Sequence, residues 1–140
     1  MKKTYHGSCT CGAVRFEADL DLSAGSFRCN CGFCKKARFW FQFASGNDFR
    51  LTQGREVLKD FQRTTPKMPQ PFLHFWFCGN CGVRAFSEGP ESKQMGPAFH
   101  AVNLACLDDA TDEELAAAPI KYVDGQHDDR KKPPAITSYL

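Results

Sequence analysis

The spacing of the cysteines constrains this chain more than any other feature. Seven of its eight cysteines fall in three short clusters, and Cys106 stands apart. The clusters are Cys9-x-Cys11, Cys29-x-Cys31-x-x-Cys34 and Cys78-x-x-Cys81. Cysteines one or two residues apart can direct two sulfurs at one metal ion, whereas a disulfide between them would be strained. The clusters therefore predict metal ligation, with zinc as the expected ion because it accepts thiolates in tetrahedral geometry.

The number of sulfurs in each cluster predicts how the cysteines divide between two zinc ions. Two pairs from distant parts of the chain supply the four thiolates that close a tetrahedron, so we expect a structural site. Its members are Cys9, Cys11, Cys78 and Cys81. The remaining cluster supplies three ligands and leaves a fourth position open, as catalytic zinc sites do. It consists of Cys29, Cys31 and Cys34. The alternative is that Cys106 or a histidine completes this second site.

Other cysteine chemistries fit the sequence less well. The Cys78-x-x-Cys81 pair resembles a thioredoxin-type redox motif, but no strand-helix-strand pattern surrounds it and Gly82 follows, as in a zinc knuckle. A nucleobase deaminase needs a His-x-Glu motif before its Pro-Cys-x-x-Cys motif, and His100-Ala101-Val102 lacks the glutamate. The cysteine spacings of ferredoxins are absent.

Length and composition predict one soluble domain. The chain has 140 residues, 42% of them hydrophobic and 24% charged, which is typical of a single globular domain. We expect a core over about residues 4–127 and a solvated tail over 128–140. A net charge of +2 gives no reason to expect a nucleic-acid or membrane partner, and no apolar run is long enough to span a membrane. Polar residues follow the N-terminal lysines where a signal peptide would be apolar, so a cytoplasmic location, which keeps cysteines reduced, is expected.

Hydrophobic patterning predicts an all-β fold. Alternation and aromatic content favour strands over residues 13–19, 39–43, 72–77, 99–104 and 120–123. Helix is scarce: a capping-box pattern at Thr111 predicts two turns over 111–118, and a brief turn is expected after Cys34. Segments 64–71 and 87–97 are rich in loop-forming residues. The expected architecture is a set of mostly antiparallel sheets pinned by zinc, with one or two very short helices.

Several motifs in order along the chain resemble one known family. They are Gly7-Ser8-Cys9-Thr10-Cys11-Gly12-Ala13-Val14-Arg15-Phe16-Glu17, Cys29-Asn30-Cys31-Gly32-Phe33-Cys34-Lys35-Lys36, Phe77-Cys78-Gly79-Asn80-Cys81-Gly82, Val102-Asn103-Leu104 with Leu107-Asp108-Asp109, and Asp124-Gly125. Together they resemble the glutathione-dependent formaldehyde-activating enzyme family, which is also represented in centromere protein V. The resemblance implies an Mss4-like fold, a tent of antiparallel sheets. This sequence departs from the family pattern at Gly32, where many members have serine.

The resemblance also implies a division of the zinc ligands and an activity. By position, Cys9, Cys11, Cys78 and Cys81 hold a structural zinc, and Cys29, Cys31 and Cys34 hold the zinc of the active site. The implied reaction condenses glutathione with formaldehyde to S-(hydroxymethyl)glutathione, and the enzyme is classed as a carbon–sulfur lyase. A small-molecule thiol and an aldehyde are then the expected partners.

The charge of the three-cysteine site favours thiol chemistry. Three thiolates around a divalent ion leave a net charge of −1, which makes the centre a poor acidifier of water. We hypothesise that the open position holds a thiol deprotonated and presents its sulfur to an aldehyde carbon. In the alternative, zinc polarises the carbonyl oxygen.

Basic residues beside the triad are candidate substrate contacts. Glutathione carries two carboxylates, and Lys35, Lys36 and Arg38 follow Cys34 closely. His74 and His100 are candidate proton carriers, because an ordinary histidine titrates near pH 6.5.

Two other functions compete with this one. A zinc-stabilised binding module without turnover needs only closed metal sites, so a fourth protein ligand on the second zinc would favour it. A lyase that acts on a different thiol adduct would use the same three cysteines.

Overall fold

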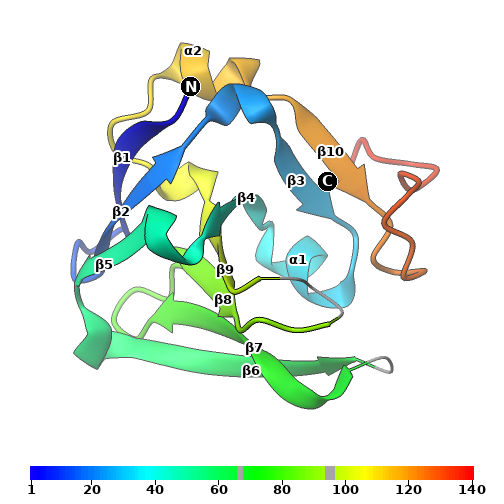
Figure 1. Cartoon of the computed structure of the whole chain (residues 1–140), viewed down its shortest axis with the longest axis horizontal. Helices are drawn as coiled ribbons and strands as arrows, with labels where there is room; N and C mark the ends of the chain where they lie inside the picture. The colour runs from blue at the N-terminus through cyan, green and yellow to red at the C-terminus, as the bar shows by residue number, and fades with distance from the viewer. Residues whose placement is uncertain (66–67, 94–96) are drawn as a thin grey trace.

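The structure, a computed structural model, describes residues 1–65, 68–93 and 97–140. Its strands form two sheets that are not closed (Figure 1). The smaller sheet has the order β1 (Lys3–Ser8), β2 (Arg15–Leu20), β5 (Phe49–Gln53). The larger has the order β10 (Ile120–Val123), β3 (Ser26–Cys29), β4 (Trp40–Ser45), β9 (Phe99–Asn103), β8 (Phe86–Gly89), β7 (Met68–Cys78), β6 (Leu58–Thr65). The predicted all-β class is confirmed. The pairing is antiparallel as expected, except that β10 and β3 are parallel.

The α-helices of the described residues are short. They are α1 (Gly32–Ala37) and α2 (Asp112–Ala117). The predicted capping box is present: the hydroxyl of Thr111 accepts from the backbone N–H of Glu114 at 3.1 Å, and the Glu114 carboxylate accepts from the Thr111 N–H at 2.9 Å. Within the described part of the chain, no helix is long and apolar enough to cross a membrane.

The main hydrophobic core lies between the two sheets. Alternate residues of β2 face it, and Phe16 stacks on Phe49 with ring centroids 5.4 Å apart. Phe49 in turn meets Phe86 of β8 at 4.6 Å. Burying one such side chain contributes about 1.5–3 kcal/mol. A second, smaller cluster contains Phe39, Phe41 and Ala101, and it forms part of the cavity described below.

Two segments expected to be loops are partly strand, so these predictions are wrong there. Strand β6 runs to Thr65 and β7 starts at Met68, while 66–67 lie outside the described residues. Segment 87–97 begins with the end of β8, and 94–96 lie outside the described residues. Pro69 and Pro71 suggested a loop, but they fall where the β6–β7 register shifts, and strands tolerate proline at such irregularities.

Five strands escaped prediction, and for β6 the reason is its exposed environment. Strands β1, β3, β5, β6 and β8 were not expected. Strand β6 lies at the edge of the larger sheet and has only β7 as a neighbour. Both of its faces are largely exposed, so its sequence needs no apolar alternation.

The C-terminal segment over 128–140 is mostly exposed, and a few of its residues contact the rest of the chain. Pro134 is buried, and residues 124 and 129 form an isolated β-bridge. Near the C-terminus, the carbonyl oxygen of Tyr139 accepts a hydrogen bond from Arg38, and the ammonium group of Lys35 lies 5.3 Å from the centre of the Tyr139 ring. The segment therefore folds back onto α1.

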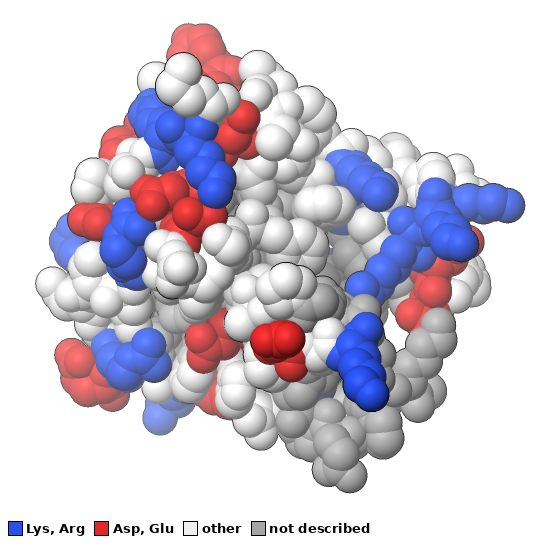
Figure 2. Space-filling view, in the orientation of Figure 1, with Lys and Arg blue, Asp and Glu red and all other residues white. Residues whose placement is uncertain are grey.

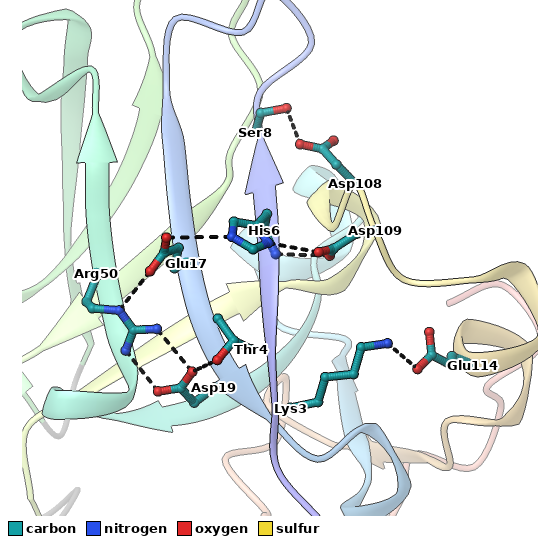
Figure 3. A network of polar contacts seen from close by, with 10 residues as sticks. All are labelled: Lys3, Thr4, His6, Ser8, Glu17, Asp19, Arg50, Asp108, Asp109 and Glu114. Atoms are coloured by element: carbon teal, nitrogen blue, oxygen red, sulfur yellow. Dashed lines mark hydrogen bonds and ion pairs between the residues drawn. The ribbon is translucent and has the colours of Figure 1, made fainter.

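A polar network joins the smaller sheet to the segments that precede and form α2 (Figure 3). The imidazole of His6 lies 2.8 Å from the Asp109 carboxylate and 3.6 Å from Glu17. Arg50 bridges Glu17 and Asp19 across β2 and β5. The hydrogen bond to Asp109 is the main cause that raises the pKa of His6 above its ordinary value.

The His6–Asp109 pair predicts a pH-dependent term in stability. A raised histidine pKa means that the pair stabilises the fold fully below about pH 6.5, and this contribution is lost as pH rises through the raised value. His6→Gln should therefore lower the melting temperature more at pH 6 than at pH 8. Asp109→Asn, which keeps an oxygen for the backbone N–H of His6, should show the same trend. A melting-temperature difference that is constant over this range would contradict the assignment.

Candidate metal centres and active site

Four cysteine sulfurs from two distant turns converge on one point. The Sγ atoms of this tetrad, Cys9, Cys11, Cys78 and Cys81, all lie within 4.8 Å of one another. Cys9 and Cys11 lie in the turn between β1 and β2, whereas Cys78 ends β7 and Cys81 lies in the turn that follows. The tetrad therefore joins the smaller sheet to one end of β7 in the larger sheet.

Each turn of the tetrad is shaped for metal ligation. Gly12 and Gly82 adopt left-handed φ values of 77° and 78°, a conformation that glycine adopts readily. The chain can thus turn tightly after each cysteine pair. The backbone N–H of Val14 lies 3.3 Å from the Cys9 sulfur and that of Asn80 lies 3.4 Å from the Cys78 sulfur. Such N–H donors stabilise the negative charge of a thiolate.

The second cluster lies where β3 passes into α1. The sulfurs of this triad, Cys29, Cys31 and Cys34, are also within 4.8 Å of one another. Cys29 ends β3, Cys31 caps the N-terminus of α1 and Cys34 lies within the helix. The N–H of Cys34 donates to the Cys31 sulfur at 3.3 Å, and the N–H of Cys31 donates to the Cys29 sulfur at 3.4 Å. This local fold therefore presents three sulfurs on one side.

The parallel pairing of β10 with β3 brings a further segment to the triad. Val123 pairs with Cys29, so the chain that leaves β10 continues beside the cysteines. Asn30 is buried and holds this segment, because its amide donates to Asp124 at 2.9 Å and accepts from the N–H of Gln126 at 2.9 Å. A Cβ at Gly125 would lie only 2.4 Å from the Cys29 sulfur. Residue 125 must therefore lack a side chain for the triad to keep this geometry.

Arg63 is a charged neighbour of the triad that sequence reasoning missed. Its guanidinium group donates to the Cys31 sulfur at 3.1 Å. Hydrogen bonds from the thiols of Cys29 and Cys34, together with the contact from Arg63, hold the pKa of Cys31 well below its ordinary value. Arg63 lies on β6, far from Cys31 in the sequence, and no motif marks it. Only the packing of the β6–β7 hairpin reveals the contact.

Cys106 is not a member of the triad. It is buried in the main core, and burial is the main cause that raises the pKa of its thiol to about 12. Its sulfur lies 3.9 Å from the carbonyl oxygen of Arg84. Among the described residues, the triad cluster contains no fourth histidine, cysteine, aspartate or glutamate.

The two histidines that were candidate proton carriers pair with acids on the larger sheet. His74 lies 2.6 Å from the Asp60 carboxylate. His100 lies 3.2 Å from Glu88 and stacks on Phe49. Neither is among the described residues that line the spaces next to the triad.

An aromatic cavity opens beside the triad. Its volume is about 290 Å³, and Cys29 and Cys34 form part of its wall. Phenylalanine is the commonest residue in the rest of the wall; these side chains are Phe27, Phe39, Phe41, Phe43, Phe75 and Phe99. Arg63, Lys121 and Arg130 are its charged lining residues. We call this space the aromatic cavity.

A second space lies along the α1 side of the triad and contains basic groups. This cationic groove has a volume of about 540 Å³. Its lining residues are Gly32, Phe33, Lys36, Ala37, Phe61, Arg63 and Arg84. The Arg84 guanidinium lies 4.9 Å from the centre of the Phe33 ring, and burial lowers its pKa. Arg63 lines both spaces, so the groove and the aromatic cavity meet at the residue that contacts Cys31.

The three predicted substrate cations separate in the structure. Lys36 lies in the cationic groove. Lys35 and Arg38 instead contact Tyr139 and line a space of only about 10 Å³ with Cys34 and Leu140. Figure 2 shows Lys and Arg gathered on the side where β10 and the C-terminal segment lie, while acidic and basic groups mix over β1 and β2.

The donor sets of both clusters fit zinc. Each is made of thiols alone, and soft sulfur ligands in a compact group favour zinc over the hard cations calcium and magnesium. Backbone N–H groups already point at sulfurs in both clusters, which lowers the cost of ionising them. Both clusters could therefore hold a metal ion.

The tetrad and the triad should differ in their effect on stability. Cys78→Ser should lower the melting temperature by more than about 10 °C, because loss of a structural zinc site removes several kcal/mol of folding free energy. Cys31→Ser should lower it by only a few degrees, because the triad lies within one short stretch of chain. Metal analysis should find one zinc per chain in each variant and two in the wild type. Equal destabilisation would mean that both sites are structural.

The close approach of Gly125 to the triad gives an independent test. Gly125→Ala places a methyl group against the Cys29 sulfur and should abolish metal binding at the triad while the tetrad stays loaded. Gly32→Ala is the matched control, because a Cβ there meets nothing within 4 Å. Cobalt substitution provides the measurement. The thiolate-to-cobalt absorption of Gly125→Ala should be about half that of the wild type, and that of Gly32→Ala should be unchanged. Equal absorption in both variants would refute the proposed contact.

Comparison with known proteins agrees with this arrangement. The family model described as "Glutathione-dependent formaldehyde-activating enzyme" matches residues 4–123. A structural genomics crystal structure of a Rhodobacter sphaeroides protein is similar, with a TM-score of 0.65 and 29% sequence identity over 83% of this chain and 99% of that one. The matched residues include both cysteine clusters, which indicates a function of the formaldehyde-activating type. The chain belongs to the glutathione-dependent formaldehyde-activating enzyme family.

Proposed function

We propose that the protein joins a thiol such as glutathione to formaldehyde or a related aldehyde, as a zinc-dependent enzyme of the carbon–sulfur lyase class. The observation that carries the proposal is a triad of cysteines, two of which line a largely aromatic cavity, with a basic groove nearby that shares Arg63 with this cavity. In the reaction, the thiol sulfur forms a bond to the aldehyde carbon. The C=O double bond becomes a C–OH single bond, and the thiol proton is transferred to the oxygen.

The two cysteine clusters take different parts in this proposal. Cys29, Cys31 and Cys34 hold the zinc of the active site, while Cys9, Cys11, Cys78 and Cys81 hold a structural zinc. Zinc at the triad supplies a position at which a substrate thiol stays deprotonated near neutral pH. The cytoplasm, where thiols remain reduced, is the compartment that suits these cysteines.

Arg63 balances charge in the site. The triad with a divalent ion carries a net charge of −1, and a substrate thiolate adds a further negative charge. The guanidinium of Arg63 lies 3.1 Å from the Cys31 sulfur and offsets part of this charge. Its positive charge therefore reduces the repulsion between an anionic substrate sulfur and the negatively charged triad.

The cationic groove is the proposed site for the body of glutathione. That tripeptide has two carboxylates, and the groove offers Lys36, Arg63 and Arg84 as partners. Since Arg63 also reaches Cys31, a molecule in the groove can place its sulfur toward the triad. Lys35 and Arg38, which contact the C-terminal segment, are assigned no substrate contact.

The arrangement of the triad favours an enzyme over a zinc-stabilised binding module. A binding module needs a closed site, and Cys106, the candidate fourth ligand, lies in the main core. Within the described chain, the triad also has no acidic or histidine side chain in its cluster. A lyase that acts on another thiol adduct remains the alternative, because it would use the same three cysteines.

Calorimetric titration with glutathione tests the proposal first. The zinc-loaded protein should bind glutathione saturably at micromolar to millimolar concentration, and Cys31→Ser should abolish that binding. With ¹³C-labelled formaldehyde, NMR exchange should show faster formation of S-(hydroxymethyl)glutathione than in the uncatalysed solution. Absence of both binding and acceleration at millimolar glutathione would exclude glutathione as substrate.

Two adjacent lysines provide a matched test of the groove. Lys36→Met should weaken glutathione binding about threefold to fivefold, since a partly exposed ion pair contributes up to about 1 kcal/mol. Lys35→Met should leave the dissociation constant unchanged, because Lys35 lies over Tyr139. Calorimetry in low and high salt is the measurement, and the difference between the variants should shrink as salt rises. Equal effects of the two substitutions would place glutathione elsewhere.

A further inference from the structure

We infer that the aldehyde taken by this site carries an aromatic or bulky apolar group, which lies in the aromatic cavity. The inference rests on the proposed function and specifies its second substrate. It starts from a mismatch between formaldehyde and the space beside the triad. Formaldehyde has two non-hydrogen atoms, whereas the cavity has a volume of about 290 Å³.

The cavity wall is shaped by packed rings. Successive rings of β4 lie 5.3 Å apart at Phe41 and Phe43, and Phe43 meets Phe99 of β9 at 5.2 Å in an edge-to-face contact. Phe27 of β3 lies 5.7 Å from Phe41. Aromatic pairs in such geometries hold each other in place, so the cavity keeps its form without a ligand. Phe43 is 44% exposed, which leaves part of its ring available for contact.

The size and polarity of the cavity fit an apolar side group. A water molecule occupies about 30 Å³ in the liquid, and an apolar cavity of about 150 Å³ can bind benzene. The aromatic cavity thus has room for a phenyl ring and a short chain. Most of its wall offers no hydrogen bond to water or to a polar ligand, so an apolar group should replace water there favourably.

The thiol is the poorer candidate for this cavity. Glutathione carries an ammonium group, two carboxylates and two amides, and each would lose hydration against phenylalanine rings. Cations are three of the seven described residues that line the cationic groove but only three of the fifteen that line the aromatic cavity, so the groove surrounds those groups with a higher share of charged partners. The two substrates therefore divide between the two spaces, which meet at Arg63.

The position of the cavity also fits the reacting carbon. Cys29 and Cys34 form part of its wall, so an aldehyde whose apolar group fills the cavity has its carbonyl directed toward the triad. The product is a hemithioacetal: the sulfur bonds to the carbonyl carbon, the C=O double bond becomes C–OH, and the thiol proton ends on oxygen. No oxidant or reductant is needed.

The test compares phenylacetaldehyde with formaldehyde on the zinc-loaded protein. NMR exchange with glutathione gives the catalysed rate for each aldehyde, and we expect phenylacetaldehyde to react at least about tenfold more efficiently. Phe43→Ala should reduce the ratio of the two efficiencies at least about fivefold, because it removes a ring from the wall. Ile136→Ala is the control, since Ile136 is also exposed and does not line the cavity.

Binding of 2-phenylethanol, an unreactive analogue, provides a second readout without thiol. Calorimetry should detect saturable binding to the wild type and to Ile136→Ala, and weaker binding to Phe43→Ala. The inference would be overturned if the protein catalysed addition of glutathione to formaldehyde but showed no preference for phenylacetaldehyde and did not bind 2-phenylethanol. The proposed function would still hold in that case. Failure of every aldehyde to react with glutathione would instead overturn the proposed function, and the inference with it.

Discussion

The convergence of four sulfurs from two turns is the contact on which the relation between the two sheets depends. The tetrad joins the β1–β2 turn to the end of β7, segments that are nearly seventy residues apart. Cys9 and Cys78 of the tetrad also belong to the hydrophobic core between the sheets. Small domains of this kind gain stability from metal ligation because an ion adds binding free energy that a limited core cannot supply.

The triad depends on a different feature, the parallel pairing of β10 with β3. Since parallel strands end at the same edge of a sheet, the chain after Val123 arrives beside Cys29. Asn30 then ties residues 124 and 126 in place, and Gly125 passes against the sulfurs. The geometry of the triad is thus maintained by backbone proximity as well as by the cysteines themselves.

The surroundings of the triad differ between the two spaces beside it. Phenylalanine rings dominate the aromatic cavity and favour apolar groups, whereas the cationic groove has a higher share of basic side chains, which favour carboxylates. Arg63 lines both spaces and contacts Cys31. It lies on the edge strand β6, so the packing of the β6–β7 hairpin places a charge next to the triad.

Features that depend on neighbours along the chain were predictable from the amino-acid sequence. These are the three short cysteine clusters, the glycine turn after Cys11, the capping box at Thr111, and an all-β class with short helices. Each is encoded within a few residues, because knuckle turns, caps and strand alternation are local in their physics.

The residues around the triad are brought there by tertiary packing and were not predictable from the sequence. Arg63 lies on β6 and contacts Cys31, whereas Cys106 is buried in the main core. Lys35 contacts Tyr139 of the C-terminal segment, while its neighbour Lys36 lines the cationic groove. These outcomes depend on strand order and on packing between residues distant in sequence. Spacing along the chain carries no information about them, since a side chain far away in sequence enters a site only when the whole sheet has formed.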